Sequence, residues 1–398
     1  MSTAMSWEGR LAQRVWDVRG GKEDSPFLRL MALTKGVPNL ISLGRGDPDL
    51  PTPPHIVQAA QRALAEGKTK YTVPPGLEEL RVAVAGQLAR ESGLQYNPEN
   101  EVIITSGTQE AVNVIFQALL NPGDEVLLPE PFYMAYYQAI RAVGGVAVTL
   151  TARLEDNFVV QPADLEAAIT PRTKAMILVS PSNPTGTVID RATTEAICQI
   201  ALKHDLVVIS DELYDKIVFD GARVTPVASL PGMWERTITV NGFSKTYSMT
   251  GLRVGYFAAP RPFADAALEV RHMMSICAPT PSQWAALAAL EGPQDCVRET
   301  LAVYAERRQL MLDGLAQVGV PTNRPQGAFF VFADIRACGM SSFDFCAALL
   351  KEKQVLVFPG TQYGRGGEGF LRISYLAPLD QLAEAIRRFG EFYHQHGR

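Results

Sequence analysis

A lysine follows an apolar run that is typical of a buried strand. The run ends at Asn241, and Lys245 stands just beyond it in the segment NGFSKTYSMTGLRVGY. In a sheet covered on both faces, the carboxyl ends of the strands open onto the crevice where ligands bind. Burial at that edge lowers the pKa of an amine and leaves it free to form an imine with a carbonyl. Taken alone, the same segment is equally compatible with a solvated lysine in a surface loop.

Two neighbouring features favour a bound phosphate. Arg253 lies eight residues after Lys245, a distance that a short loop can fold back to the same crevice, and a guanidinium binds phosphate through two parallel N–H donors. The segment IITSGTQEAVNVIF passes from a strand through Ser106, Gly107 and Thr108 into a helix. The free N–H groups and the positive dipole end of that helix attract phosphate. A plainer interpretation makes Thr108 the N-cap of the helix, and the two interpretations are compatible.

Three further segments bring polar or aromatic side chains to strand ends. Asp211 ends the apolar run VVISD, with Tyr214 after it, and a carboxylate buried there needs a cationic partner such as a protonated ring nitrogen. Asn183 lies in SNPTG, where its amide can donate to a phenolate oxygen, and Tyr133 in EPFYMAY can stack on a flat ring. Each segment also has a plainer explanation: a turn-capping aspartate, an Asn–Pro–Thr–Gly turn and a core tyrosine.

Alternating strands and helices place these segments in an α/β fold. Amphipathic helices are expected at Gln109–Leu120 and Arg191–His204. Such alternation predicts a mostly parallel, seven-stranded sheet sandwiched by helices, whose strand ends share one crevice. The expected strands are Glu101–Thr105, Glu125–Leu128, Val146–Leu150, Ala175–Val179, Val207–Ser210, Thr237–Val240 and Arg253–Ala258.

The last part of the chain follows a different pattern. A long helix at Gln294–Val318 precedes QGAFFVFADI, a second helix at Ser342–Lys353, the short runs VLVFPG and FLRISY, and a closing amphipathic helix. This α+β pattern predicts a smaller domain built from the C-terminal part and the N-terminal segment. We expect an arm with one helix at residues 1–45, a ligand-binding large domain at 46–290 and the small domain at 291–398.

Composition excludes several classes of partner. The net charge of −5 gives no electrostatic footprint for nucleic acid or an anionic membrane. No apolar run approaches the ~18 residues that span a bilayer, and the N-terminus MSTAMSWEGRLAQRVWDVRG does not resemble a secretion signal. The five cysteines are scattered without a CxxC pair, which is typical of a reducing compartment, so we expect a cytoplasmic protein. The five histidines form no ligand set, and no metal site is expected.

In combination, the segments SNPTG, SDELY, SKTYSMTGLRVGY and FLRISY resemble the class I and II aminotransferases, the aspartate aminotransferase-like group of fold-type I pyridoxal phosphate (PLP) enzymes. The resemblance runs from Ile41–Pro53 to Phe370–Leu376 and keeps the family's order. It implies that Lys245 holds PLP as a Schiff base and later shuttles a proton. Further residues are implied to contact the cofactor: Ser106, Gly107, Thr108, Tyr133, Asn183, Asp211, Tyr214, Ser244 and Arg253.

The resemblance also assigns individual roles. Asp211 is expected to pair with the pyridinium nitrogen, Asn183 and Tyr214 to contact the 3′ oxygen, and Tyr133 to stack on the ring. The serine, glycine, threonine and arginine members of the set are expected to hold the phosphate. Together with Lys245, the pair Asp211 and Tyr214 forms the expected catalytic group.

Three more residues match positions that contact substrate or a partner subunit. Tyr71, in KYTVPPGLEELR, resembles the tyrosine that reaches the phosphate of a neighbouring subunit, which implies a homodimer with shared active sites. Arg372 resembles the arginine that clamps the substrate α-carboxylate, with Gly46 and Asn183 at the same end. The implied reaction moves an amino group between an L-amino acid and a 2-oxo acid, in ping-pong fashion through pyridoxamine phosphate.

The chain departs from the family at several positions. Many members carry serine three residues before the lysine, where this chain has Gly242, so the phosphate would depend more on the rest of its cradle. The ring-stacking position, often Trp or Phe, is Tyr133, and Arg45 stands where a smaller or apolar residue is expected. Met273 and Met274 occupy the region where dicarboxylate-specific members carry an arginine.

The two methionines favour an apolar, aromatic or broad side-chain pocket, although Arg45 or Arg29 could supply a charge. We therefore expect aspartate/aromatic-type or broad specificity.

Other functions share parts of this sequence pattern. The same Lys245 and Asp211 could serve a C–S lyase or related β-elimination enzyme, or a cyclopropane-forming synthase. A PLP-binding sensor domain of a transcription regulator is disfavoured, because the ~45 residues before ISLGRG are too few for a typical helix-turn-helix module and carry no basic stripe. The stretch Gly364–Gly369 formally matches GxGxxG, but it runs into a strand rather than from a strand into a helix, so a dinucleotide site is rejected.

Overall fold

Seven strands form the main sheet of the computed structural model, which describes residues 10–15 and 26–396. Strands β7, β6, β5, β3 and β4 are parallel neighbours in this order, and β8 runs antiparallel to both β7 and β2. The expected mostly parallel sheet is confirmed, and each expected strand lies within two residues of its observed bounds. The strands are β2 (Val102–Thr105), β3 (Glu125–Glu130), β4 (Val146–Thr151), β5 (Thr173–Val179), β6 (Val207–Asp211), β7 (Thr237–Gly242) and β8 (Gly255–Ala258).

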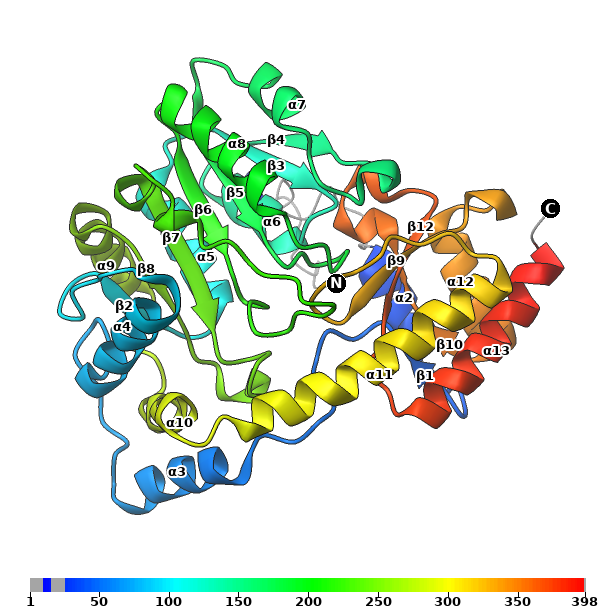
Figure 1. Ribbon diagram of the computed structural model, residues 1–398, viewed down its shortest axis with the longest axis horizontal. Helices are drawn as coiled ribbons and strands as arrows, with labels where there is room; N and C mark the ends of the chain where they lie inside the picture. The colour runs from blue at the N-terminus through cyan, green and yellow to red at the C-terminus, as the bar shows by residue number, and fades with distance from the viewer. Residues whose placement is uncertain (1–9, 16–25, 397–398) are drawn as a thin grey trace, which may run out of the picture.

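Helices cover both faces of this sheet, as Figure 1 shows. Consecutive residues of a strand point to opposite faces, and in β2, Ile103 packs toward one helical layer while Ile104 packs toward the other. Because both faces are buried, the strands read as continuous apolar runs rather than as alternating patterns. The first layer contains α5 (Thr108–Leu119), α6 (Met134–Ala142) and α9 (Arg261–Ser275). The second contains α3 (Pro54–Ala65), α4 (Glu78–Ser92), α7 (Pro162–Ala167), α8 (Arg191–Lys203) and α10 (Thr280–Glu291).

A second, smaller sheet has its own apolar core. Strand β12 (Phe370–Ser374) pairs antiparallel with both β11 (Phe358–Pro359) and β9 (Phe330–Asp334). The helices packed around it are α11 (Asp295–Val318), α12 (Ser342–Lys353) and α13 (Leu379–His396). Helix α11 runs from the α10 side of the main sheet to this second sheet, with α13 beside it (Figure 1).

The N-terminal segment joins this second unit. Strand β1 (Ile41–Ser42) pairs in parallel with β10 (Val355–Leu356), and α2 (Pro26–Leu33) packs on α12. The expected smaller α+β unit, built from the C-terminal part and the N-terminal segment, is therefore present. Much of the expected arm, residues 1–9 and 16–25, lies outside the described residues, as does most of the N-terminal stretch compared with secretion signals.

The glycine-rich stretch near the end of the chain forms a tight loop that leads into β12. It contains the 3₁₀ turns Gly360–Tyr363 and Arg365–Gly367. A Cβ atom on Gly360 would lie 2.1 Å from the carbonyl oxygen of Gly367, so only glycine permits this approach. The Glu130 carboxylate, at the end of β3, accepts a hydrogen bond from the backbone N–H of Gly366 at 3.0 Å. This loop is followed by a strand, the context that disfavours a dinucleotide site.

No helix among the described residues is long and apolar enough to cross a membrane. All five cysteines are free thiols.

Next to the end of β6, Glu212 is a deeply buried carboxylic acid. It is 6% exposed, and its side chain accepts a hydrogen bond from Ser210 Oγ at 2.8 Å. Burial raises the pKa of Glu212 to about 8, and the nearby carboxylates of Asp215 and Asp211 raise it further. Because this value lies above the ordinary 4.5, the folded state keeps a proton that the unfolded chain has released.

We predict that Glu212→Gln stabilises the protein at alkaline pH. As pH rises from about 4.5 to about 8, Glu212 costs the native chain up to about 1.4 kcal/mol of unfolding free energy per pH unit, and the loss then levels off. Glutamine does not titrate and can still accept the Ser210 hydrogen bond. Denaturant unfolding at several pH values should show the gap between variant and native chain widening in favour of the variant. A gap that does not change with pH would contradict the assignment.

Candidate active site

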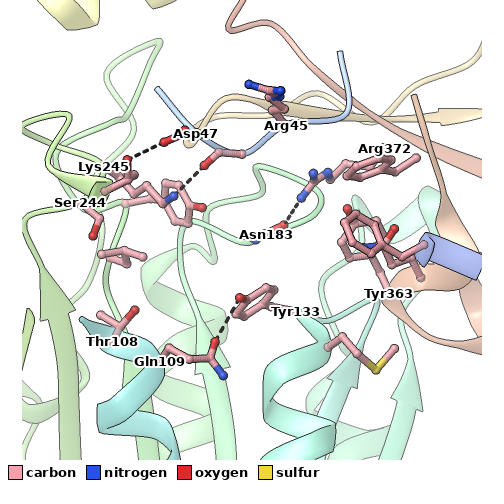
Figure 2. A pocket seen from close by; sticks show the side chains of 18 of the residues that line it. Arg45, Asp47, Thr108, Gln109, Tyr133, Asn183, Ser244, Lys245, Tyr363 and Arg372 are labelled. Atoms are coloured by element: carbon pink, nitrogen blue, oxygen red, sulfur yellow. Dashed lines mark hydrogen bonds between the residues drawn. The ribbon is translucent and has the colours of Figure 1, made fainter. Parts of the chain in front are cut away.

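A cavity of about 770 Å³ lies at the carboxyl ends of β5, β6 and β7. Most residues that the sequence singled out for chemistry meet there, on segments far apart in the chain, as Figure 2 shows for several of them. Ser106 and Gly107 adjoin the cavity through the turn before Thr108, whereas Tyr71 does not line it. The expected residues that line it are Gly46, Thr108, Tyr133, Asn183, Asp211, Tyr214, Ser244, Lys245, Arg253 and Arg372.

Lys245 places an amine in the centre of this cavity. Its Nζ donates a hydrogen bond to the carbonyl oxygen of Gly46 at 2.6 Å. Burial lowers the pKa of Lys245 to about 8; the Asp47 carboxylate opposes this shift, and the guanidinium groups of Arg372 and Arg253 add to it. A substantial fraction of the amine is therefore neutral, and nucleophilic, near physiological pH.

Asp211, the last residue of β6, faces the same cavity as a buried carboxylate. It is 6% exposed; Oδ1 accepts a hydrogen bond from the Leu213 backbone N–H at 3.0 Å, and Oδ2 accepts one from the Tyr136 hydroxyl. Burial raises the pKa of Asp211, and these two hydrogen bonds oppose the shift. A cation bound opposite Asp211 would favour its ionised form and lower its pKa. Tyr136 was not expected from the sequence, although it lies one helical turn after Tyr133.

The turn before α5 and the arginine after η5 (Thr250–Leu252) form a cradle of hydrogen-bond donors. Gly107 is the N-cap of α5, with φ of 76°, and no side chain caps the helix, so the expectation that Thr108 is the N-cap is wrong. The reason is that only the glycine adopts this left-handed geometry easily. Arg253 donates to the Ser106 carbonyl at 3.4 Å, and a Cβ on Gly107 would lie 2.5 Å from its Nη2.

The departure at Gly242 has a steric explanation. A Cβ atom at this position would lie 3.1 Å from the Cα of Gly255 and 3.4 Å from the Thr108 methyl group. The close packing of β7 on β8 and on the first residue of α5 thus leaves little room for a serine.

At the other end of the cavity, Arg372 is a buried guanidinium in an aromatic enclosure. It is 5% exposed, and the rings of Phe330, Tyr363 and Phe358 lie 4.3, 4.8 and 5.4 Å from its central carbon. Nη1 donates to Asn183 Oδ1 at 3.0 Å, and Nη2 to the Gly44 carbonyl. Over the described ranges no carboxylate pairs with it and its Nε has no partner. A buried cation of this kind fits an anionic ligand group.

The two methionines that favoured an apolar substrate pocket do not line the cavity of this chain. Met273 and Met274 are 80% and 47% exposed, because they lie near the outer end of α9. Arg29 stacks on Phe343 at 4.4 Å, outside the cavity, whereas Arg45 lies at its edge. The apolar lining comes instead from residues that the sequence did not single out: Phe27, Met31, Leu40, Leu356 and Phe358.

The donor set fits PLP. Lys245 would supply the amine for its carbonyl and Asp211 the carboxylate for its ring nitrogen, and Tyr133 lies beside α5, where its hydroxyl donates to Gln109 Oε1 at 3.1 Å (Figure 2). The uncapped N-terminus of α5 together with Arg253 fits a phosphate. The described residues contain no group of His, Cys, Asp and Glu that could hold a metal ion.

Comparisons with known proteins agree with this geometry. A family model described as "Aminotransferase class I and II" matches residues 38–389. The aromatic-amino-acid aminotransferase 2 of Thermococcus litoralis and an aspartate aminotransferase of Pyrococcus abyssi are each 39% identical over 366 residues, 92% of this chain and 94% of theirs. A crystal structure of Pyrococcus protein-A1 superimposes with a TM-score of 0.93 at 38% identity, covering 96% of this chain and 98% of that one.

We predict that Lys245 reacts at unusually low pH in the protein without ligand. Only the neutral amine undergoes reductive methylation, so labelling of Lys245 should rise through a midpoint near pH 8, against about 10.4 for an ordinary lysine. Mass spectrometry of the peptide that contains Lys245 measures the extent of labelling at each pH. The exposed Lys203, with 67% of its side chain accessible, is the internal control. A midpoint above pH ~10 for Lys245 would contradict the prediction.

Proposed function

Because the chain belongs to the class I and II aminotransferases and is a PLP-dependent transaminase acting on amino acids and 2-oxo acids, we propose that Lys245 is the residue that attaches the cofactor. The observation that carries this proposal is the convergence of Lys245, Asp211, Arg253 and Arg372 on one cavity. When bound, PLP supplies an electron sink for the breaking Cα–H bond of the amino acid. Lys245 Nζ would take the proton from Cα as a general base and deliver it, as a general acid, to the carbon that was the cofactor's aldehyde carbon.

The residues around the ring position orient the cofactor. Asp211 holds the proton on the pyridine nitrogen, and the Tyr136 hydroxyl keeps that carboxylate aligned. Asn183 and Tyr214 contact the 3′ oxygen, and Tyr133 covers one face of the ring. The 41% exposure of Tyr133 in the single chain leaves its ring accessible for stacking.

The phosphate is held by donors at the other end of the same groove. The backbone at Ser106 and Gly107, the hydroxyls of Thr108 and Ser244, and the Arg253 guanidinium supply them. A bound phosphate would accept hydrogen bonds from the free N–H groups of the uncapped helix, and it would bring a negative charge to the Arg253 guanidinium.

Arg372 binds the substrate α-carboxylate, with Gly46 and Asn183 beside it. Asn183 Oδ1 accepts a hydrogen bond from Arg372 Nη1 at 3.0 Å. The aromatic rings around the Arg372 guanidinium exclude water, which strengthens its interaction with an anion. Fixing the carboxylate places the Cα hydrogen within reach of Lys245 Nζ. Arg372 therefore positions the substrate and does not itself take part in proton transfer.

For substrate range, we favour aspartate and aromatic amino acids. The apolar residues Phe27, Met31 and Leu356 offer a surface for an aromatic side chain, and Arg45 at the cavity edge offers a cation for a distal carboxylate. The names of the relatives from Thermococcus litoralis and Pyrococcus abyssi include both activities. No feature of the cavity favours the C–S lyase alternative.

Exposed side chains support a homodimer. Tyr71 and Val73 are 77% and 55% exposed, and Met273 and Met274 are also exposed, although large apolar side chains are usually buried. We propose that this surface meets a second copy and that Tyr71 reaches the phosphate bound there. The free cysteines support a cytoplasmic location.

For the domain organisation, we propose an arm at residues 1–45, a large domain at 46–290 and a small domain at 291–398.

We predict that Arg372→Met abolishes most activity while PLP binding persists. The PLP-loaded native protein should transfer amino groups from L-aspartate and L-phenylalanine to 2-oxoglutarate, measured as the 2-oxo acid products. The variant should lose about 100-fold in kcat/KM, since a charge-assisted hydrogen bond contributes roughly 1.5–3 kcal/mol. Arg372→Lys, which keeps the charge, should lose less.

Two outcomes of that assay would contradict the proposal. If kcat/KM is unchanged in Arg372→Met, Arg372 does not bind the substrate α-carboxylate. Release of pyruvate and ammonia from cysteine conjugates in the absence of any acceptor acid, with no transfer activity, would favour the lyase.

We predict that Tyr71 acts across the dimer. Lys245→Ala and Tyr71→Ala chains should each be nearly inactive alone. A hybrid of the two contains one site with native Lys245 and native Tyr71, and therefore should regain about half of the native activity per dimer. If Tyr71 served its own chain, the hybrid would remain as inactive as the parents. Sequential affinity purification on two different tags, one on each chain, isolates the hybrid.

A further inference from the structure

A buried arginine behind the phosphate cradle takes no part in the site described so far. Arg271, in α9, is 0% exposed, and its Nε lies 3.5 Å from Glu110 Oε2. Nη1 donates to the carbonyl of Pro74 at 2.5 Å and to that of Ile276 at 3.1 Å. Burying a guanidinium is costly even when it is paired, so an ion pair retained at this depth needs a role.

Its partner, Glu110, reaches the turn that precedes α5. Glu110 is in the first turn of this helix, and its Oε2 accepts a hydrogen bond from the backbone N–H of Ser106 at 2.5 Å. The other oxygen accepts from the Ser275 hydroxyl. The carboxylate thus fixes the backbone just before Gly107. It also places a negative charge beside the helix N-terminus that would receive a phosphate, and like charges repel strongly where water is excluded.

On its other side, Arg271 holds the segment that carries Tyr71. The hydrogen bond from Arg271 to the Pro74 carbonyl is one of several that hold this segment in place. Gln283 accepts from the Leu77 backbone N–H at 2.6 Å and donates to Thr72 Oγ1 at 3.2 Å. Arg271 therefore contacts both this segment and Glu110, the acid that binds the backbone of the phosphate turn.

We propose that Glu110 and Arg271 are a positioning pair that sets the phosphate turn and ties it to the segment presenting Tyr71. Glu110 orients the Ser106 turn, and Arg271 neutralises Glu110 so that the turn still accepts a dianion. Through the Pro74 carbonyl, the same guanidinium fixes the position from which Tyr71 extends. This inference rests on the proposed role of the turn in binding the cofactor phosphate.

The affinity for PLP compared with that for pyridoxal, which lacks the phosphate, tests the pair. In the full-length apoprotein, Arg271→Met leaves Glu110 charged and unpaired beside the phosphate. The Kd of PLP, measured by fluorescence titration, should rise at least tenfold, and the Kd of pyridoxal should change less than twofold. Glu110→Gln in the same chain removes the repulsion but keeps a hydrogen-bond acceptor, so the double variant should recover to within about threefold of the native Kd.

Arg308→Met is the matched control. Arg308 is 3% exposed and pairs with Asp220 at 2.8 Å, away from the cavity. This variant should lose thermal stability without changing the ratio of the two Kd values. Equal weakening of PLP and pyridoxal in Arg271→Met, or no weakening of either, would overturn the proposal. If that variant does not fold, Arg271→Lys replaces it, with an intermediate rise for PLP alone expected and an equal shift for both ligands again overturning it.

Two further measurements separate the parts of the inference. Hydrogen exchange in Arg271→Met should quicken both at residues 106–108 and at residues 70–77, and not in Arg308→Met. Slow exchange retained at 70–77 would overturn the link to Tyr71. Arg253→Met is the reference for the phosphate itself: if it does not discriminate PLP from pyridoxal, the proposed phosphate site fails rather than the positioning pair.

Discussion

The active-site cavity is organised by buried charges that the chain itself does not fully neutralise. Asp211 and Arg372 are 6% and 5% exposed and line the same cavity as Lys245, and neither has an ion-pair partner among the described residues. In the protein alone, burial raises the pKa of Asp211 and lowers that of Lys245 to about 8, so burial disfavours the charged form of each group. A ligand with a cationic ring nitrogen and a carboxylate reverses this preference. The free energy lost in burying the groups is thus recovered on binding.

The parallel sheet explains why these groups converge. Asp211 ends β6, Lys245 follows β7, and Asn183 follows β5, and these strands are parallel neighbours with their carboxyl ends on one edge. Arg372 comes from the second sheet, which packs against that edge. The cavity therefore depends on two cores that the same chain builds separately. The long helix α11 connects them (Figure 1).

The sequence predicted what short-range patterns encode. Apolar runs located all seven strands of the main sheet, and polar residues at their ends located Lys245 and Asp211. Tyr136 was missed because its contact with Asp211 joins residues 75 positions apart. The assignment of Thr108 as a cap failed because the left-handed backbone at Gly107 moved the helix start.

The substrate side of the cavity was harder to predict. Its apolar surface comes from Phe27 and Met31 of α2 and from Phe358 of β11, which only the packing of the two units brings to the main sheet. Met273 and Met274, singled out through the family resemblance, are exposed and do not line the cavity of their own chain.

The close contact of Gly360 with Gly367 limits how this chain can diversify. Side chains at these positions would push apart the loop that carries Tyr363 and leads into the strand of Arg372, so natural drift there is confined. The wall formed by α2, which brings Phe27 and Met31 to the cavity, has no such backbone contact among the described residues, so substitutions there can change the shape of the cavity without moving the loop. The glycine loop beside Arg372 therefore constrains the part of the cavity that carries the chemistry, whereas α2 borders the part that can vary with the substrate.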